Sequence, residues 1–292
     1  MMFFLMWGLS SSCVREDYSN CYNRYYVDLS YMGDGIKEIF NDKMSKVQMY
    51  IFNSETDCIS ATELTEREIQ KRQAMLPPLN EGDYRIVFLG NPHSTFVGGL
   101  TSSDLEQVLF AAEDYVNGET VSGNDSLYFA SMSYTIEPFH KKRQPVYRQA
   151  DFHCAHYDVS VEVTGVPPVT RAAGSYPVIK IEGLSPYTDF TQRVCGEPAV
   201  YQLETRYDGV NTMTASCSIM RHLNHEDVWL KIYSPFGEEL ASVNFATFIT
   251  TNKDLIDCSK EEVLIPFKVE FKSIGIEITV PEWVVKDLHP EY

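Results

Sequence analysis

The sequence predicts an all-β protein with one or two short helices, built as two β-sandwiches in tandem. Three observations favour this fold class. The 292 residues are about twice the length of a typical single domain, which allows one large β domain or two ordinary ones. Aromatic residues make up 13% of the chain, and together with the many Val and Ile residues they suit pleated, half-buried surfaces. Apolar and polar residues also alternate along several segments, as in strands with one buried face.

Four segments of the N-terminal half have the pattern of strands. Residues 25–32 and 46–52 each place alternate apolar side chains on one face. Residues 84–89 are apolar on both faces, which predicts a central strand covered on both sides. Period-two alternation resumes at residues 128–136, whereas the polar, charge-rich residues 54–73 are predicted to be a link.

Helices are expected in two places. A turn at residues 33–35 precedes a short helical turn that ends near Phe40. The clearest helix is expected from Ser103, because Ser103 can cap the chain while Glu106 reaches back to it. Apolar residues recur there at helical spacing: Leu105, Val108, Leu109, Ala112 and Val116. Gly118 predicts the end of this helix.

The second half predicts a sandwich of Greek-key type. Residues 157–164 and 228–233 alternate between apolar and polar side chains. Residues 263–271 and 274–280 alternate in the same way, and a tight turn near Ser273 joins them as a β-hairpin. The apolar face of this hairpin requires a second sheet to cover it. The similar strand spacing of the two halves indicates two related sandwiches.

The domain boundary is expected between residues 137 and 150. There the basic cluster at residues 140–143 interrupts an otherwise acidic chain just before Pro145. We therefore predict an N-terminal domain at residues 23–145 and a C-terminal domain at residues 146–292.

The first residues predict a lipoprotein signal. Residues 1–9 form an apolar run too short to span a bilayer, and three serines separate it from Cys13, which resembles the cysteine of a lipobox. We expect a signal peptide at residues 1–12, lipidation of Cys13 and a lipidated tether at residues 13–22. A buried N-terminal strand is the alternative interpretation. Residues 14–17 (Val-Arg-Glu-Asp) resemble the signal that directs Bacteroidetes-type lipoproteins to the outer face of the outer membrane.

The six remaining cysteines are an even number in a chain predicted to be exported. They are Cys21, Cys58, Cys154, Cys195, Cys217 and Cys258. Disulfides are permitted but not implied, because no CxxC or zinc-like spacing occurs. Free buried cysteines are an equally good interpretation.

Charge and motifs exclude several classes of function. The net charge of −17 repels phosphate backbones, so no nucleic-acid partner is expected. No GxSxG, HExxH, Walker or GxGxxG motif occurs, so neither catalysis nor a cofactor is expected. His153 and His156 lie three apart on a strand and point to opposite faces, so they are not expected to share a metal. His222, His225 and the two acidic residues that follow are predicted to form a solvated loop.

Two features concern glycans. The tripeptide Asp125-Ser126-Leu127 resembles the short O-glycosylation site of the same kind of bacteria, so Ser126 is a candidate for modification. The abundant aromatic rings can stack on sugars, although alternating Tyr and Phe residues are more often core residues and cross-strand pairs.

Several short motifs also follow one another in a characteristic order. They are Cys13, VDLSYM at 27–32, KVQMYIFN at 46–53, GDYRIVFLGN at 82–91 and IEITV at 276–280, followed by Trp283. In this order they resemble the FimB-type fimbrillin-like anchor lipoproteins of Bacteroidetes fimbriae. The resemblance covers nearly the whole chain.

The resemblance implies two transthyretin-like β-sandwich domains, an outer-membrane lipid anchor at Cys13 and attachment of a fimbria to the cell surface, with some control over its length. It implies no catalysis. The implied partners are fimbrial stalk or accessory subunits, joined when an extended segment of one subunit fills a groove in another. The alternative function is that of a surface lipoprotein that binds a glycan or a host protein through exposed loops.

Overall fold

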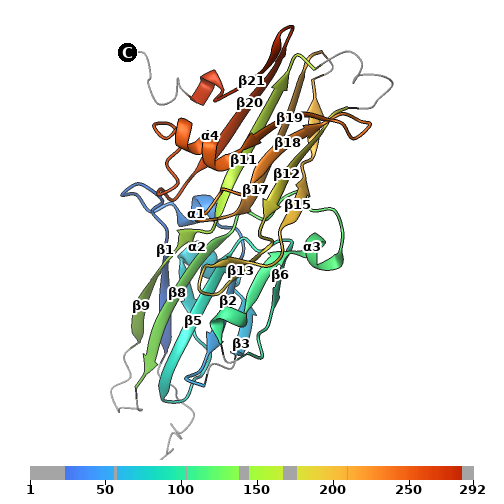
Figure 1. The fold of residues 1–292 in the computed structure, drawn as a ribbon. Coiled ribbons are helices and arrows are strands. Elements are labelled where there is room, and N and C mark those ends of the chain that lie inside the picture. Colours follow the sequence, from blue (N-terminus) through green and yellow to red (C-terminus); the bar gives the residue numbers. More distant parts are fainter. Residues whose placement is uncertain are drawn as a thin grey trace, which may run out of the picture.

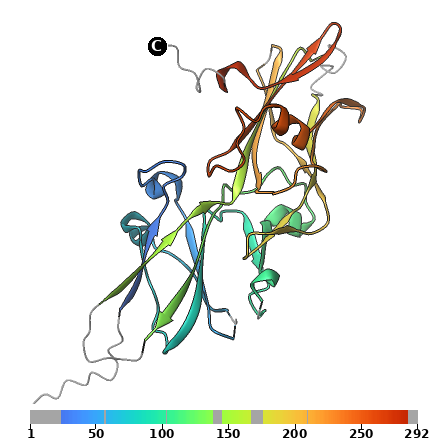
Figure 2. The ribbon, with the colours of Figure 1, turned by 60° about the vertical axis from the view of Figure 1, so that its left-hand side comes forward.

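The strands form five sheets in two bodies, seen in a computed structural model of the protein (Figures 1 and 2). The structure describes residues 24–55, 58–102, 104–137, 145–166, 176–208 and 210–284. The predicted signal peptide, Cys13 and the basic cluster at residues 140–143 lie outside the described residues. The predicted all-β class is confirmed, although the described residues contain more short helices than the one or two expected.

The first body, at the bottom of Figure 1, has three layers. Its central sheet has the order β10-β8-β5-β2-β3. These strands are β2 (Val47–Phe52), β3 (Cys58–Glu63), β5 (Gly82–Gly90), β8 (Tyr128–Ile136) and β10 (His153–Cys154). One flanking sheet is β4-β1-β9, made of β1 (Tyr25–Ser30), β4 (Gln73–Met75) and β9 (Val146–Asp151). The other is β14-β13-β7-β6, made of β6 (Thr95–Gly98), β7 (Leu109–Ala112), β13 (Tyr187–Asp189) and β14 (Val194–Cys195).

The middle strand β5 is buried on both faces, which confirms the prediction for residues 84–89. Ile86 and Phe88 belong to a buried cluster shared with β1, whereas Val87 and Leu89 belong to a second cluster shared with β7 and Phe190. Burial of each such side chain contributes about 1.5–3 kcal/mol. Sheets on both sides of β5 therefore hold the first body together.

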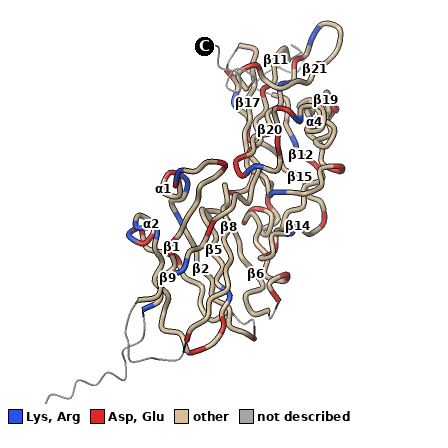
Figure 3. Tube along the Cα trace, turned by 90° about the vertical axis from the view of Figure 1, so that its left-hand side faces the viewer, with Lys and Arg blue, Asp and Glu red and all other residues tan. Residues whose placement is uncertain are grey.

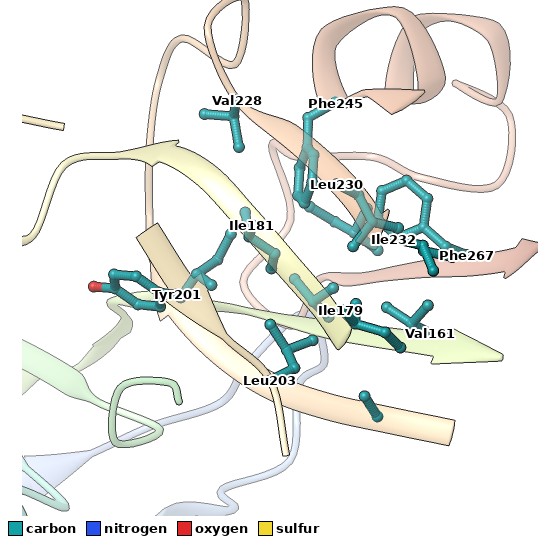
Figure 4. Close-up of a cluster of buried hydrophobic side chains, with 14 of the residues drawn as sticks. Val161, Ile179, Ile181, Tyr201, Leu203, Val228, Leu230, Ile232, Phe245 and Phe267 are labelled. Atoms are coloured by element: carbon teal, nitrogen blue, oxygen red, sulfur yellow. The ribbon is translucent and has the colours of Figure 1, made fainter. Parts of the chain in front are cut away.

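The second body is a sandwich of two sheets. One sheet has the order β16-β17-β11-β20-β21, made of β11 (His156–Thr164), β16 (Thr205–Tyr207), β17 (Thr212–Met220), β20 (Leu264–Lys272) and β21 (Gly275–Thr279). The other has the order β15-β12-β18-β19, made of β12 (Val178–Leu184), β15 (Ala199–Gln202), β18 (Trp229–Tyr233) and β19 (Glu239–Asn244). In the core between them, Ile179, Ile181 and Leu230 lie across from Val161 and Phe267 (Figure 4).

Helix α4 (Phe245–Thr251) packs on the core of this sandwich. The Asn244 side chain caps it by accepting a hydrogen bond from the Thr247 N–H at 3.0 Å. Phe245 and Phe248 are buried, and their ring centroids lie 5.0 and 4.3 Å from that of Phe267. The helix is short, so its aromatic contacts rather than its intrinsic propensity stabilise it.

The helix predicted from Ser103 to Val116 is wrong. That segment contains a 3-10 turn η1 (Leu105–Gln107), strand β7 and helix α3 (Glu113–Asn117), and Ser103 lies outside the described residues. β7 pairs with β6 on one side and β13 on the other, and these ladders outweigh the helical spacing of its apolar residues. Gly118 does end α3, with the left-handed φ of 73° that suits glycine.

The predicted link at residues 54–73 also contains regular structure. Strand β3 and helix α2 (Glu66–Lys71) lie within it. Thr65 Oγ1 accepts from the Glu68 N–H at 3.3 Å, and Glu68 Oε2 accepts from the Thr65 N–H at 2.9 Å, which is a capping box. The helical turn expected over Ile36, Ile39 and Phe40 is not observed at those residues; helix α1 (Phe40–Lys43) begins at Phe40 instead.

The chain first passes from one body to the other at Ala155. β9 pairs in parallel with β1, and β10 pairs with β8, so residues 146–154 belong to the first body. β13 and β14 also join the first body, although β12 before them belongs to the second. The predicted boundary at residue 145 therefore does not coincide with the change of sheet, because extended chain runs on from β9 through β10 to β11.

The described part of the chain has three further properties. Its five cysteines, Cys58, Cys154, Cys195, Cys217 and Cys258, are free thiols. None of its helices is long and apolar enough to cross a membrane. Acidic residues are spread over both bodies rather than gathered in one place (Figure 3).

Candidate interaction surfaces

The two predicted modification sites differ in what the structure describes. Cys13 lies outside the described residues, and its lipidation stays a prediction. Ser126 is exposed in the loop before β8, and its hydroxyl lies 3.0 Å from the Ser218 hydroxyl of β17. The Ser126 carbonyl accepts a hydrogen bond from Asn91 Nδ2 at 3.3 Å. Ser126 thus lies where the two bodies meet, and its glycosylation stays a prediction.

His153 and His156 have different surroundings. The His153 side chain is 69% exposed, and its Nδ1 lies 2.8 Å from Glu261 Oε1. His156 is buried, with its Nδ1 2.9 Å from the Leu127 carbonyl oxygen and 3.2 Å from Cys154 Sγ. Among the described residues no group of three or more His, Cys, Asp or Glu side chains can hold a metal ion.

His222 and His225 are buried, so the prediction of a solvated loop is wrong for these two side chains. Their ring centroids lie 6.0 Å apart, and the Tyr157 and Phe245 rings pack against His225. His222 Nε2 accepts a hydrogen bond from the Ser185 N–H at 3.3 Å, which leaves no room for a proton on that nitrogen. Burial, with His225 as a second cause, lowers the pKa of His222 to about 4.

A cluster of polar groups joins the two bodies around Glu262. Glu262 Oε1 accepts from the Tyr31 hydroxyl at 2.5 Å, and Oε2 accepts from Lys43 Nζ at 2.7 Å. Tyr31 and Lys43 belong to the first body, whereas Glu262 lies just before β20 of the second. Burial by itself would raise the pKa of Glu262, but these two hydrogen bonds outweigh it and hold that pKa below its usual value.

Asp34 and Arg221 hold the same loop from two sides. The Asp34 carboxylate accepts the backbone N–H groups of Glu261 and Glu262, at 2.9 and 3.1 Å. The Arg221 guanidinium donates to four backbone carbonyls, those of Cys154 at 3.3 Å, Cys258 at 2.9 Å, Glu261 at 3.1 Å and Lys260. The junction between the bodies is therefore a specific hydrogen-bonded contact rather than a loose linker.

Free sheet edges are surfaces at which another chain can add a strand. Among the described residues, four edge strands have five residues or more, namely β3, β9, β19 and β21. The pairing of β3 with β2 and that of β19 with β18 each contain a register shift. β9 exposes Tyr147 together with the polar residues Arg148, Gln149 and Asp151. Irregular pairing and charge both disfavour addition of a strand.

β21 combines regular pairing with exposed apolar residues, and its charged residue Glu277 is paired with Lys272. It pairs with β20 in unbroken register from Lys268 with Thr279 to Lys272 with Gly275. Ile276 is 43% exposed, and Ile274 in the adjoining turn is 97% exposed. The predicted hairpin is confirmed, but the apolar residues near its tip are not covered by the facing sheet. β21 is thus a regular free edge with exposed aliphatic residues.

The hairpin of β20 and β21 also lies far from the start of the described chain. β20 runs parallel to β11, which leads away from the first body, so the hairpin tip lies at the outer end of the second body (Figure 1). β1 runs parallel to β9, which leads toward the second body, so β1 begins at the opposite end. The chain that precedes β1 therefore enters at one end of the molecule, and the free edge lies toward the other.

Comparison with known protein families gives one match. A family model described as fimbrillin-A associated anchor proteins Mfa1 and Mfa2 matches residues 18–288. No curated protein matches the chain in sequence.

Solved structures share the fold over most of the chain. The fimbrial anchor protein Mfa2 from Porphyromonas gingivalis is 16% identical, with a TM-score of 0.67 over 88% of this chain and 96% of that one. A candidate adhesin from Bacteroides ovatus is 15% identical, with a TM-score of 0.70 over 88% and 94% of the two chains. A candidate polysaccharide-binding protein from Bacteroides thetaiotaomicron is 11% identical, with a TM-score of 0.69 over 90% and 97%. At these identities the similarity establishes the fold.

Proposed function

The chain belongs to the family of fimbrillin-A associated anchor proteins Mfa1 and Mfa2, and from this premise we propose that it anchors a fimbria at the outer membrane. The observation that carries the proposal is the match of the family model, which spans residues 18–288 and therefore both bodies. In this function the protein helps to assemble the fimbria or to limit its length. No catalytic step is part of the proposal.

We place the membrane attachment at Cys13. Two or three acyl chains on this cysteine hold a protein in one leaflet, since each buried CH₂ contributes about 0.8 kcal/mol. Cys13 precedes β1, which begins at the end of the first body remote from the second. The body with its net charge of −17 then stands in water, with the first body nearer the lipid.

We place the docking of a stalk subunit at the free edge of β21. A strand added there continues the five-stranded sheet through backbone hydrogen bonds, and its alternate side chains cover Ile276. The edge lies toward the end of the molecule opposite the tether, where a growing fimbria meets no membrane. In this arrangement the anchor accepts a strand rather than donating one.

The experiment compares the wild-type chain with Cys13→Ala and with Cys21→Ala in cells that make the cognate fimbria. Cells are fed a palmitate analogue, treated with external protease, and solubilised for capture of the chain and mass spectrometry. We expect lipid label on the wild type and on Cys21→Ala, none on Cys13→Ala, and fimbrial subunits with the wild type. Absence of label from the wild type overturns the lipid anchor, and absence of any fimbrial subunit overturns the docking.

A further inference from the structure

The sheet β16-β17-β11-β20-β21 has one face turned away from the core, and small hydroxyl side chains line the middle of that face. The strand register places Ser160 beside Ser216 and Glu162 beside Thr214, and Arg206 of β16 lies on the other side of Thr214. Ser216, Thr214 and Arg206 are exposed, whereas Ser160 and Glu162 are half-buried. The middle of this outward face, called here the floor, therefore consists of small polar side chains, with the carboxylate of Glu162 and the guanidinium of Arg206 two strands apart.

The segment that follows β21 turns this floor into a cavity. Pro281 is buried, and the Val284 N–H donates to the Pro281 carbonyl at 3.1 Å, which makes a turn that carries Trp283. Trp283 is 46% exposed. The cavity has a volume of about 330 Å³ and is lined by Trp283 and Pro281 as well as by the floor residues and Glu204. Its size is at the lower end of the range typical of small-molecule sites, ~300–1,000 Å³.

Within the described part of the chain, the charged groups of this cavity have no ion-pair partner. No ion pair involves Glu162, Glu204 or Arg206 within the described residues. Ser160 Oγ is shielded from solvent and has no hydrogen-bond partner among the described residues. A buried hydroxyl without a partner costs stability unless a bound molecule supplies one. The cavity thus offers an aromatic ring together with unpaired donors and acceptors.

A second polar cavity adjoins the first. Its volume is about 310 Å³, and it shares Glu204 and Ser216 with the first cavity. Ser94, Asp114 and Asp125 line its other parts. A ligand that occupies both cavities is therefore elongated and rich in hydroxyl groups.

We propose that these two cavities, called here the outer groove, bind a neutral oligosaccharide. One face of a pyranose ring carries C–H groups that stack on the Trp283 ring, while its hydroxyls donate to the carboxylates of Glu162 and Glu204 and accept from Arg206. The groove contains more carboxylates than cations, so it repels sugars that carry carboxylate or sulfate groups. This binding does not depend on anchoring, because β21 and Cys13 contribute nothing to it.

The test uses tryptophan fluorescence of the full chain. Only Trp7, Trp229 and Trp283 occur in the sequence, so the variant with Trp7→Phe and Trp229→Phe reports on Trp283 alone. The purified variant is titrated separately with linear trisaccharides of glucose, galactose and mannose. We expect one of them to give a saturable fluorescence change with a Kd of about 1 mM or below. No saturable change with any of the three at roughly 10 mM overturns the proposal.

Substitutions then locate the site by calorimetry with the trisaccharide that binds. We expect Trp283→Ala and Arg206→Ala each to weaken binding by roughly tenfold or more. Trp229→Ala and Arg85→Ala are the matched controls, because these residues are exposed on other sheets, and they should leave the Kd unchanged. Arg206 is exposed, so its variant should fold even if Trp283→Ala does not. Unchanged affinity in Arg206→Ala places the sugar elsewhere and overturns the assignment to the outer groove.

Discussion

His222 and His225 are buried in a loop whose neighbour Leu223 is 97% exposed. The folded protein holds His222 uncharged, since the pKa of this side chain falls from 6.5 to about 4. The unfolded chain takes up a proton below pH 6.5, and the folded chain does so only below about 4. The free energy of unfolding should therefore fall by about 3 kcal/mol as the pH drops from 6.5 to 4.

Urea unfolding of the wild type and of His222→Gln across this pH range tests this prediction. We expect the loss of stability between pH 6.5 and 4 to be clearly smaller in His222→Gln. His93→Gln is the control, because His93 is exposed and its removal should leave the pH dependence unchanged. Equal pH dependence in all three proteins would mean that His222 is not the group responsible.

Arg221 illustrates a single residue that fixes a loop. Its planar guanidinium donates to carbonyls on both sides of the junction. The single ammonium group of a lysine cannot reach all of these carbonyls at once. We expect Arg221→Lys to lower the free energy of unfolding by about 2 kcal/mol in urea denaturation. Arg85→Lys, at an exposed residue of β5, should change it by less than about 0.5 kcal/mol. Similar values for the two variants would contradict this role.

Residue roles of this kind were only partly predictable from the sequence. The pair Thr65 and Glu68 has the spacing of a capping box and was a usable local signal. The partners of Glu262 are different, because Tyr31 lies 231 residues away along the chain. The burial of His225 likewise depends on the rings of Tyr157 and Phe245, which come from distant parts of the chain, and no local pattern contains that information.

At the scale of elements, strands were predictable wherever one face is buried. β11 follows the period-two pattern, because alternation is the direct consequence of a half-buried pleat. β2 was predicted from its apolar residues at alternate positions, although in the central sheet it is buried on both faces. The segment of β7 was not predictable in this way. Its four residues are apolar at spacings that also fit a helix, and only the pairing with β6 and β13 decides between the two.

The free edge of β21 leads to a prediction about an element. A lysine at position 276 introduces a charge where a donated strand must bury an apolar side chain, which disfavours its addition. We expect Ile276→Lys to weaken capture of the fimbrial stalk subunit by roughly tenfold or more, with little change in stability because Ile276 is 43% exposed. Ile59→Lys is the matched control, since Ile59 is 46% exposed on the edge strand β3. Equal capture by both variants would move the docking site away from β21.

At the scale of the whole molecule, the tandem arrangement was predictable but its division was not. The length and the strand spacing indicate two sandwiches, and two bodies are observed. The chain does not divide between them at one point, because β13 and β14 return to the first body and complete its third sheet. Phe190 next to β13 packs in the same cluster as Val87 and Leu89 of β5. The return of β13 and β14 to the first body changes neither the composition nor the hydrophobic pattern of the sequence, so it could not be predicted.

In the proposed arrangement, with the membrane attachment at one end and the stalk subunit at the other, any pull on the fimbria passes through the junction between the two bodies. Glu262 accepts hydrogen bonds from Tyr31 and Lys43 across that junction. Its pKa in the folded protein lies below the usual value, so its stabilising effect is fully present above that usual value and is lost as the pH falls through the folded-state pKa. We therefore expect the contribution of Glu262 to the junction to be present near neutral pH and to be lost in acid.

Glu262→Gln removes the charge from this contact while keeping the shape of the side chain. We expect the free energy of unfolding at pH 7 to fall by about 2 kcal/mol, because a hydrogen bond to a charged group is worth more than a neutral one. We also expect faster hydrogen exchange at the Glu261 and Glu262 amides, which the Asp34 carboxylate holds in the wild type. Glu119→Gln, at an exposed residue after α3, should change neither quantity. If exchange at residues 261 and 262 is unchanged in Glu262→Gln, the strands shared between the bodies, rather than this contact, keep the two sandwiches together.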